Sequence, residues 1–204
     1  MKTKQIFVTG ISTEVGKTVA SAILTEALEA DYWKPIQAGD LDTSDSHKIA
    51  DFISNSKTVI HKNSYALQTP MSPHAAAEID GVVIEVDKIV APKTTNHLVI
   101  EGAGGLLVPL NDNDTILDII DPSHQVVVVS RHYLGSINHT LLTVNYLEER
   151  GFKVSIIFSG EEHKTTESII LSKTNAKLIG RIEEEPYFDK NVIKEYADLF
   201  RDNL

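Results

Sequence analysis

The feature that most constrains the fold is a glycine-rich segment near the amino terminus, Gly10 to Thr18, with the sequence GISTEVGKT. A short apolar run at residues 6–8 precedes it, and an Ala- and Leu-rich helical pattern at residues 17–29 follows it. A turn in this position offers backbone N–H groups to phosphate oxygens at the amino end of the helix. The segment therefore predicts a phosphate-binding loop (P-loop) and a strand–turn–helix opening of an α/β fold.

Three residues of this segment have the chemistry that a P-loop needs. Gly16 allows close approach of the backbone, Lys17 places a positive charge near the β- and γ-phosphates, and Thr18 offers a hydroxyl to magnesium. Five residues separate the two glycines, where the common pattern has four, and Ile11 stands where the first glycine is expected. An ordinary strand–turn–helix with a surface lysine is the alternative interpretation.

Apolar runs without polar alternation recur along the chain, as expected for parallel strands that are covered on both faces. They lie at residues 6–8, 98–100, 126–129, 154–158 and 178–179. Helical patterns lie at residues 17–29, 137–150, 167–173 and 190–200. One face of the second pattern is apolar, with Ile137, Leu141, Val144 and Leu147. The alternation predicts a doubly wound α/β fold of P-loop NTPase type, with a mostly parallel sheet and helices on both faces.

The chain has 204 residues, of which 42% are hydrophobic and 24% charged. We therefore expect one domain that spans residues 1–204 and buries its own core. Residues 36–95 are less regular and contain Pro70, Pro73 and Pro92. We interpret them as helices and loops inserted between two strands. Such loops are placed to line a ligand site beyond the carboxyl ends of the strands.

Charge and composition exclude several classes of function. The net charge of −10 repels nucleic acid on average. The absence of cysteine excludes disulfides, a cysteine nucleophile and thiolate metal sites. Only residues 5–9 precede Gly10 as an apolar run, which is too short for a signal peptide, and no run is long enough to span a membrane. We expect a soluble, cytoplasmic protein without nucleic-acid or membrane partners.

Two carboxylates are candidates for magnesium, which prefers hard oxygen ligands. Glu101 follows the apolar run 98–100, at the expected end of a strand, and the glycine-rich segment 102–105 after it is expected to turn. A solvated glutamate before a glycine turn is the alternative. Asp45, in the segment 41–46, reads by itself as a helix cap.

A second lysine, Lys34, precedes Pro35, which disfavours a helix and makes Lys34 extended. A lysine near the P-loop stabilises the negative charge that develops during phosphoryl transfer. A surface lysine is the alternative. The aromatic residues before it, Tyr32 and Trp33, are predicted to belong to a core or an interface rather than to stack on a base.

Together these residues resemble the dethiobiotin synthetase family. The similar blocks stand in the same order as in that family: residues 7–10 with 13–18, Lys34-Pro35 with Gly39, Ser72-Pro73-His74, Glu101 to Gly105, and Leu134 to His139. After residue 150 the chain resembles the family only in its alternation of strands and helices. The family makes dethiobiotin, a biotin precursor, from 7,8-diaminononanoate, CO2 and ATP, with Mg2+.

The resemblance implies a mechanism. One substrate amine takes up CO2 as a carbamate, whose oxygen attacks the γ-phosphate to give a carbamic–phosphoric anhydride. The second amine closes the ring and expels phosphate. Positioning and charge stabilisation are then the main tasks of the protein. The resemblance also implies a homodimer with an isologous interface.

The resemblance assigns roles residue by residue. Catalysis falls to Lys17 and Lys34, and magnesium binding to Thr18, Asp45 and Glu101. The nucleotide is assigned Glu14, Val15, Gly16, Lys17, Thr18, Val19, Asp45, Glu101, Gly102, Ala103 and Gly104. The diamine is assigned Thr13, Ala38, and, from the partner subunit's helix start, Ser136 and Asn138. Ala38 stands where the family has a serine, and Gln37 is the residue placed to compensate.

Other segments depart from the family pattern. Ser159-Gly160 aligns with a family Asn-Asp near the adenine, and Glu183 to Glu185 with a Pro-Trp-Leu segment. Two other functions are compatible with a P-loop. A partitioning or cell-division ATPase switch shares the fold, but the chain lacks a basic membrane helix, a basic DNA patch and an extra lysine near the loop start. A small-molecule kinase does not need the blocks at 101–105 and 134–139.

Overall fold

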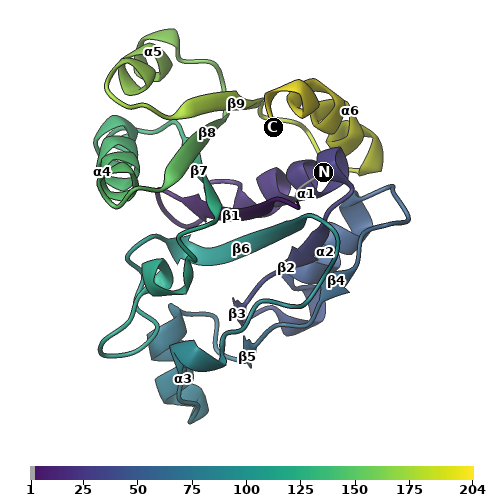
Figure 1. Ribbon diagram of the computed structural model, residues 1–204, viewed down its shortest axis with the longest axis vertical. Helices are drawn as coiled ribbons and strands as arrows, with labels where there is room; N and C mark the ends of the chain where they lie inside the picture. The colour runs from purple at the N-terminus through teal and green to yellow at the C-terminus, as the bar shows by residue number, and fades with distance from the viewer. Residues whose placement is uncertain (1–2) are drawn as a thin grey trace.

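The computed structural model describes residues 3–204, so Met1 and Lys2 lie outside the described residues. The main sheet has the strand order β4-β2-β6-β1-β7-β8-β9, and every pair of neighbours is parallel (Figure 1). Its strands are β1 (Gln5–Gly10), β2 (Asp31–Trp33), β4 (Ile60–His61), β6 (Leu98–Gly105), β7 (Gln125–Arg131), β8 (Lys153–Ser159) and β9 (Lys177–Ile182). A second, two-stranded parallel sheet joins β3 (Ile36–Ala38) and β5 (Tyr65–Leu67).

Within residues 3–204, six α-helices surround the sheet: α1 (Lys17–Leu28), α2 (Asp45–Phe52), α3 (Pro73–Asp80), α4 (Ser136–Glu149), α5 (Lys164–Ser172) and α6 (Lys190–Phe200). Short 3₁₀ turns lie at Leu41–Thr43, Val86–Lys88, Ile116–Ile119 and Arg201–Asn203. Helices α1, α2 and α6 pack into one apolar cluster and α3, α4 and α5 into another, so the sheet is covered on both faces. The doubly wound α/β fold predicted from the sequence is confirmed.

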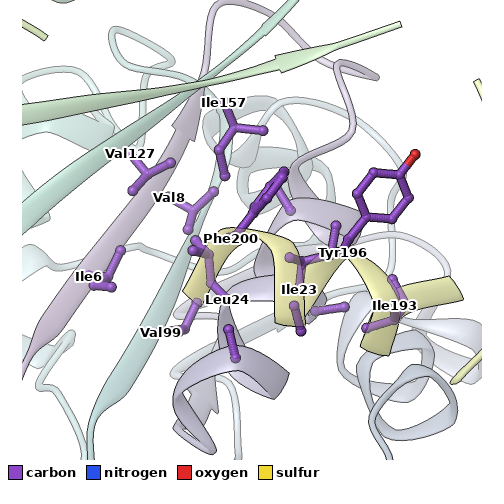
Figure 2. Close-up of a cluster of buried hydrophobic side chains, with 14 of the residues drawn as sticks. Ile6, Val8, Ile23, Leu24, Val99, Val127, Ile157, Ile193, Tyr196 and Phe200 are labelled. Carbon is purple, nitrogen blue, oxygen red and sulfur yellow. The ribbon is translucent and has the colours of Figure 1, made fainter. Parts of the chain in front are cut away.

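The strands form where they do because their side chains are buried on both faces. Strand β7 buries Val126 to Val129 completely, as a parallel strand between two helical layers requires. On the first face, Ile23 and Leu24 of α1 and Phe200 of α6 meet the strand residues Val8 and Val127 (Figure 2). This packing fixes α1 against the sheet, and with it the turn that joins β1 to α1.

The structure corrects three details of the sequence prediction. Strand β6 does not end before Glu101 but continues to Gly105, because Gly10 pairs with Gly105. The segment 36–95 contains three short strands besides helices and loops, and β4 joins the main sheet. On α4, Ile137 is 37% exposed, because the helix turns Ser136, Thr140, Val144 and Leu147 toward the core.

In the part of the chain that the structure describes, none of the helices has the length and apolar character needed to span a membrane.

Candidate functional site

The turn between β1 and α1 is shaped for an anion. Gly16 has φ +93° at the start of α1, and Glu14 is also left-handed, with φ +55°. A Cβ on Gly10 would lie 2.6 Å from the side chain of Val15, so the turn closes tightly on itself. Within residues 3–204 no side chain caps the amino end of α1. Its first backbone N–H groups are therefore free to donate to phosphate.

A cleft of about 950 Å3 opens beside this turn. Its lining includes most of the residues assigned from the sequence: Thr13, Glu14, Gly16, Lys17, Thr18, Val19, Lys34, Ala38, Asp45, Glu101, Ala103 and Gly104. The cleft thus brings together the P-loop, the second lysine and both candidate carboxylates, which lie far apart in the sequence.

At the base of the cleft a lysine lies between two carboxylates. Lys34 Nζ is 2.5 Å from Asp45 Oδ2 and 3.0 Å from Glu101 Oε1. The Thr18 hydroxyl is 3.1 Å from Asp45 Oδ1 and 3.0 Å from Glu101 Oε1. Lys34 is 5% exposed and Glu101 1%, so burial strengthens the attraction between these charges.

The register of the sheet explains this cluster. Trp33 pairs with Ile100, so the next residues along the two strands, Lys34 and Glu101, lie side by side. Thr18 enters from the first turn of α1 and Asp45 from the first residue of α2. Ser44 caps α2, with the His47 side chain completing a capping box.

The pKa values of the two lysines shift in opposite directions, because burial decides the shift of Lys17 and the carboxylates decide that of Lys34. Burial lowers the pKa of Lys17 from 10.5 to about 8, although Glu101 partly offsets the effect. Burial alone would also lower the pKa of Lys34, but Glu101 and Asp45 outweigh it and raise the pKa. Lys34 therefore stays cationic, and Lys17 Nζ donates to the Ser12 carbonyl at 3.0 Å.

The donor set fits a magnesium ion. Two carboxylates and a hydroxyl converge, and a cation, the Lys34 ammonium, already lies against the carboxylates. No group of three or more His, Cys, Asp or Glu side chains arranged to hold a metal occurs within residues 3–204. The site would thus rely on oxygen ligands from Thr18, Asp45 and Glu101 together with the phosphates of a nucleotide, which suits Mg2+.

Four assigned residues do not line the cleft. The side chain of Val15 is 2% exposed and packs in the core. Gly102 faces the ring of Phe7, which a Cβ would approach to 3.0 Å. Ser136 is buried at the start of α4 and Asn138 is exposed. The last two were assigned to the cleft of a partner subunit.

The contacts of two side chains at the site, Tyr32 and Gln37, escaped the sequence prediction. The Tyr32 hydroxyl donates to Glu101 Oε2 at 2.8 Å, and burial together with Glu101 raises its pKa well above the ordinary value. Gln37 donates to the Gly39 carbonyl and accepts from the Asp45 N–H. Its side chain therefore holds the start of α2, and it also lines the cleft beside Ala38.

The end of the cleft beyond the P-loop is formed by the segments that depart from the family pattern. Ser159, Gly160 and Glu183 to Glu185 line it. Arg131, at the end of β7, also lines it and donates to the Glu14 carbonyl and the Glu184 carboxylate, both at 3.3 Å. Its position at the carboxyl end of a strand beside β1 was the signal available in the sequence.

The fold is shared with a plasmid partition protein and a ParA family ATPase. A plasmid partition protein from Borrelia burgdorferi superposes with a TM-score of 0.62 at 14% identity, covering 100% of this chain and 98% of that one. A ParA family ATPase from Chlorobium tepidum gives a TM-score of 0.57 at 12% identity, covering 96% and 98%. At such low identity these similarities show the P-loop NTPase-like fold alone.

Sequence similarity is more specific. A family model described as an AAA domain matches residues 4–192. The ATP-dependent dethiobiotin synthetase BioD of Christiangramia forsetii is 61% identical over 202 residues, covering 98% of both chains. The protein of the same name from Cytophaga hutchinsonii is 47% identical, again over 98% of both. The chain therefore belongs to the ATP-dependent dethiobiotin synthetase family, and it is an ATP-dependent ligase that forms carbon–nitrogen bonds.

Proposed function

We propose that the protein converts 7,8-diaminononanoate, CO2 and ATP into dethiobiotin, ADP and phosphate. The observation that carries the proposal is the convergence, in one cleft, of the P-loop, two lysines and the Thr18–Asp45–Glu101 oxygens in a chain of this family. One amine of the substrate bonds to CO2, a carbamate oxygen displaces ADP from the γ-phosphorus, and the second amine displaces phosphate from the carbamate carbon.

The residues of the cleft divide these tasks. The backbone N–H groups after Gly10 and at the start of α1 hold the phosphates. Lys17, with its ammonium at the turn, neutralises the transferred phosphoryl group. Lys34 stabilises the carbamate and the charge that develops on it, and Thr13 and Ala38 border the diamine. When bound, Mg2+ on Thr18, Asp45 and Glu101 supplies positive charge at the β- and γ-phosphates.

A homodimer completes the proposed site. The start of α4 exposes apolar side chains, with Leu134 fully exposed, Tyr133 40% and Ile137 37%. Helix α4 has no side-chain cap at its amino end within residues 3–204. The Ser136 N–H donates to the Tyr133 carbonyl, which leaves the N–H groups of Ile137 and Asn138 for a carboxylate. In the dimer this helix end, with Ser136 and Asn138, would face the diamine's carboxylate in the neighbouring subunit's cleft.

The test is an assay of ADP release in which substrates are omitted one at a time. We expect turnover only when ATP, Mg2+, bicarbonate and 7,8-diaminononanoate are all present, with dethiobiotin as the product. Equal ATP consumption without the diamine would favour a nucleotide-dependent switch and contradict the proposal. Transfer of phosphate to another acceptor would favour a kinase.

A further inference from the structure

A buried tyrosine lies behind the carboxylate–lysine cluster, and the reaction described above makes no use of it. Tyr32 on β2 has no exposed surface. Its hydroxyl donates to Glu101 Oε2 at 2.8 Å. The other oxygen, Oε1, lies 3.0 Å from both the Thr18 hydroxyl and the Lys34 ammonium. The two oxygens of Glu101 are thus divided between a partner in the core and the cleft.

The sheet builds this arrangement. Tyr32 pairs with Val99, which lies two residues before Glu101 on β6. Side chains two residues apart on a strand point to the same face, so Tyr32 reaches Glu101 diagonally across neighbouring strands. Both residues face the α1 side, where Tyr32 and Val99 belong to the same buried cluster. The contact is therefore held by rigid elements and not by a loop.

We propose that the Tyr32 hydroxyl is a positioning group that holds Glu101 Oε2 in the core and thereby presents Oε1 to the divalent ion. The proposal rests on the proposed function, since it takes Glu101 as a magnesium-directed carboxylate. Glu101 is 1% exposed, so loss of the hydroxyl would leave a buried carboxylate oxygen without its partner. An unpartnered Oε2 would turn toward the Lys34 ammonium, and the lysine would then compete with the metal for both oxygens.

The test is Tyr32→Phe, which removes one oxygen and keeps the ring. Mg2+ affinity of the ADP-bound protein, measured by calorimetry, is expected to fall about 10-fold or more, as is usual for groups that orient a metal ligand. The Mg2+ concentration needed for half-maximal turnover should rise in parallel, while kcat at saturating Mg2+ stays within a few-fold of wild type. A purely structural role would lower the melting temperature without moving either Mg2+ constant.

The matched control is Tyr65→Phe. Tyr65 lies on β5 of the small sheet and does not line the cleft. Its hydroxyl accepts a hydrogen bond from the Glu85 N–H at 3.0 Å. Its loss should leave both Mg2+ constants unchanged. Wild-type Mg2+ affinity in folded Tyr32→Phe would overturn the proposal.

A second measurement serves if Tyr32→Phe does not fold. In wild-type protein labelled with carbon-13 at tyrosine Cζ, adding Mg2+ to the ADP complex should shift the Tyr32 signal and leave the Tyr65 signal in place. An unmoved Tyr32 signal would overturn the inference while the metal site stands. Absence of any Mg2+ binding by the wild-type protein would instead overturn the proposed metal site and the inference with it.

Discussion

Lys34 could be a surface lysine on the sequence alone, but the fold buries it between two carboxylates. Its ammonium is almost completely buried and contacts two carboxylates. An unpaired buried lysine would lose its proton, but here Glu101 and Asp45 raise its pKa. The side chain therefore keeps its positive charge inside the cleft. In the proposed reaction this charge would meet the developing negative charge with little reorganisation.

Replacement of either cleft lysine by alanine should reveal this contribution. We expect Lys34→Ala or Lys17→Ala to reduce kcat by about 100-fold or more, since such charge-stabilising groups contribute roughly 3 kcal/mol. Steady-state kinetics measure the loss, and circular dichroism checks the fold. Lys57→Ala, which removes an exposed partner of Glu29, is the control and should retain normal turnover. Near-normal turnover of Lys34→Ala would remove Lys34 from the mechanism.

For single residues, the sequence predicted which side chains gather at the site, but it did not predict the contacts that hold them there. The P-loop, Lys34, Asp45 and Glu101 were identified from local patterns and from family resemblance. The cleft is lined by most of the P-loop from residue 13 to 18 and by all three of the other residues. The Tyr32–Glu101 bond was not predictable, because it depends on β2 lying next to β6, which follows it by a long insertion. Tyr32 was correctly predicted as a core residue.

Among the elements, α1 is tied to the segment that follows α2 through one buried carboxylate. Glu26 accepts hydrogen bonds from the Ser54 hydroxyl and N–H, and from the Asn55 N–H and side chain. Burial alone would raise the pKa of Glu26, but these bonds outweigh it and leave the pKa below its ordinary value of 4.5. The link holds the two helices that supply Thr18 and Asp45.

This link should make stability depend on pH. A carboxylate with a depressed pKa in the folded state stabilises the protein above pH 4.5, and the effect disappears as the pH falls through the folded-state pKa. Glu26→Gln should therefore lower the free energy of unfolding by about 1 to 3 kcal/mol at neutral pH. The difference from wild type should shrink in acid. Urea unfolding at a series of pH values measures both.

Glu29→Gln is the control for this prediction, because its carboxylate is about half exposed and pairs with Lys57 at the surface. It should leave the pH profile close to that of wild type. A Glu26→Gln deficit that stayed constant down to low pH would contradict an ionic origin of the link.

Element positions were predictable where the apolar pattern was long and uniform, as in α6, whose predicted and observed bounds agree. Element bounds and buried faces were less predictable where contacts between elements determine them. The glycines after Glu101 resemble a turn, yet β6 continues to Gly105, which pairs with Gly10. This close pairing suits glycine, because a Cβ on residue 105 would lie only 3.3 Å from the Gly10 carbonyl oxygen. Ile137 was placed on the core face by periodicity alone, whereas the small buried residues Ser136 and Thr140 let α4 approach the sheet.

For the whole molecule, the proposed dimer gives a prediction of its own. Leu134 is fully exposed beside the start of α4, so Leu134→Asp should leave the fold intact while it places a charge in the proposed interface. We expect sedimentation analysis to show a dimer for wild type and a monomer for the variant, with weaker binding of the diamine. Leu199→Asp is the control, because the Leu199 side chain lies on the solvent face of α6 and is 70% exposed. A variant that remains dimeric would place the interface elsewhere.

The central position of β1 in the sheet has a consequence for how the chain folds during its synthesis. Strand β1 is synthesised before both of its neighbours, β6 and β7, which are completed only at residues 105 and 131. Pairing across these long sequence separations therefore comes late and slowly. The turn after β1 is supported on both sides only once residue 131 has been synthesised, so a translation product that stops earlier would contain the sequence of the turn without its folded shape.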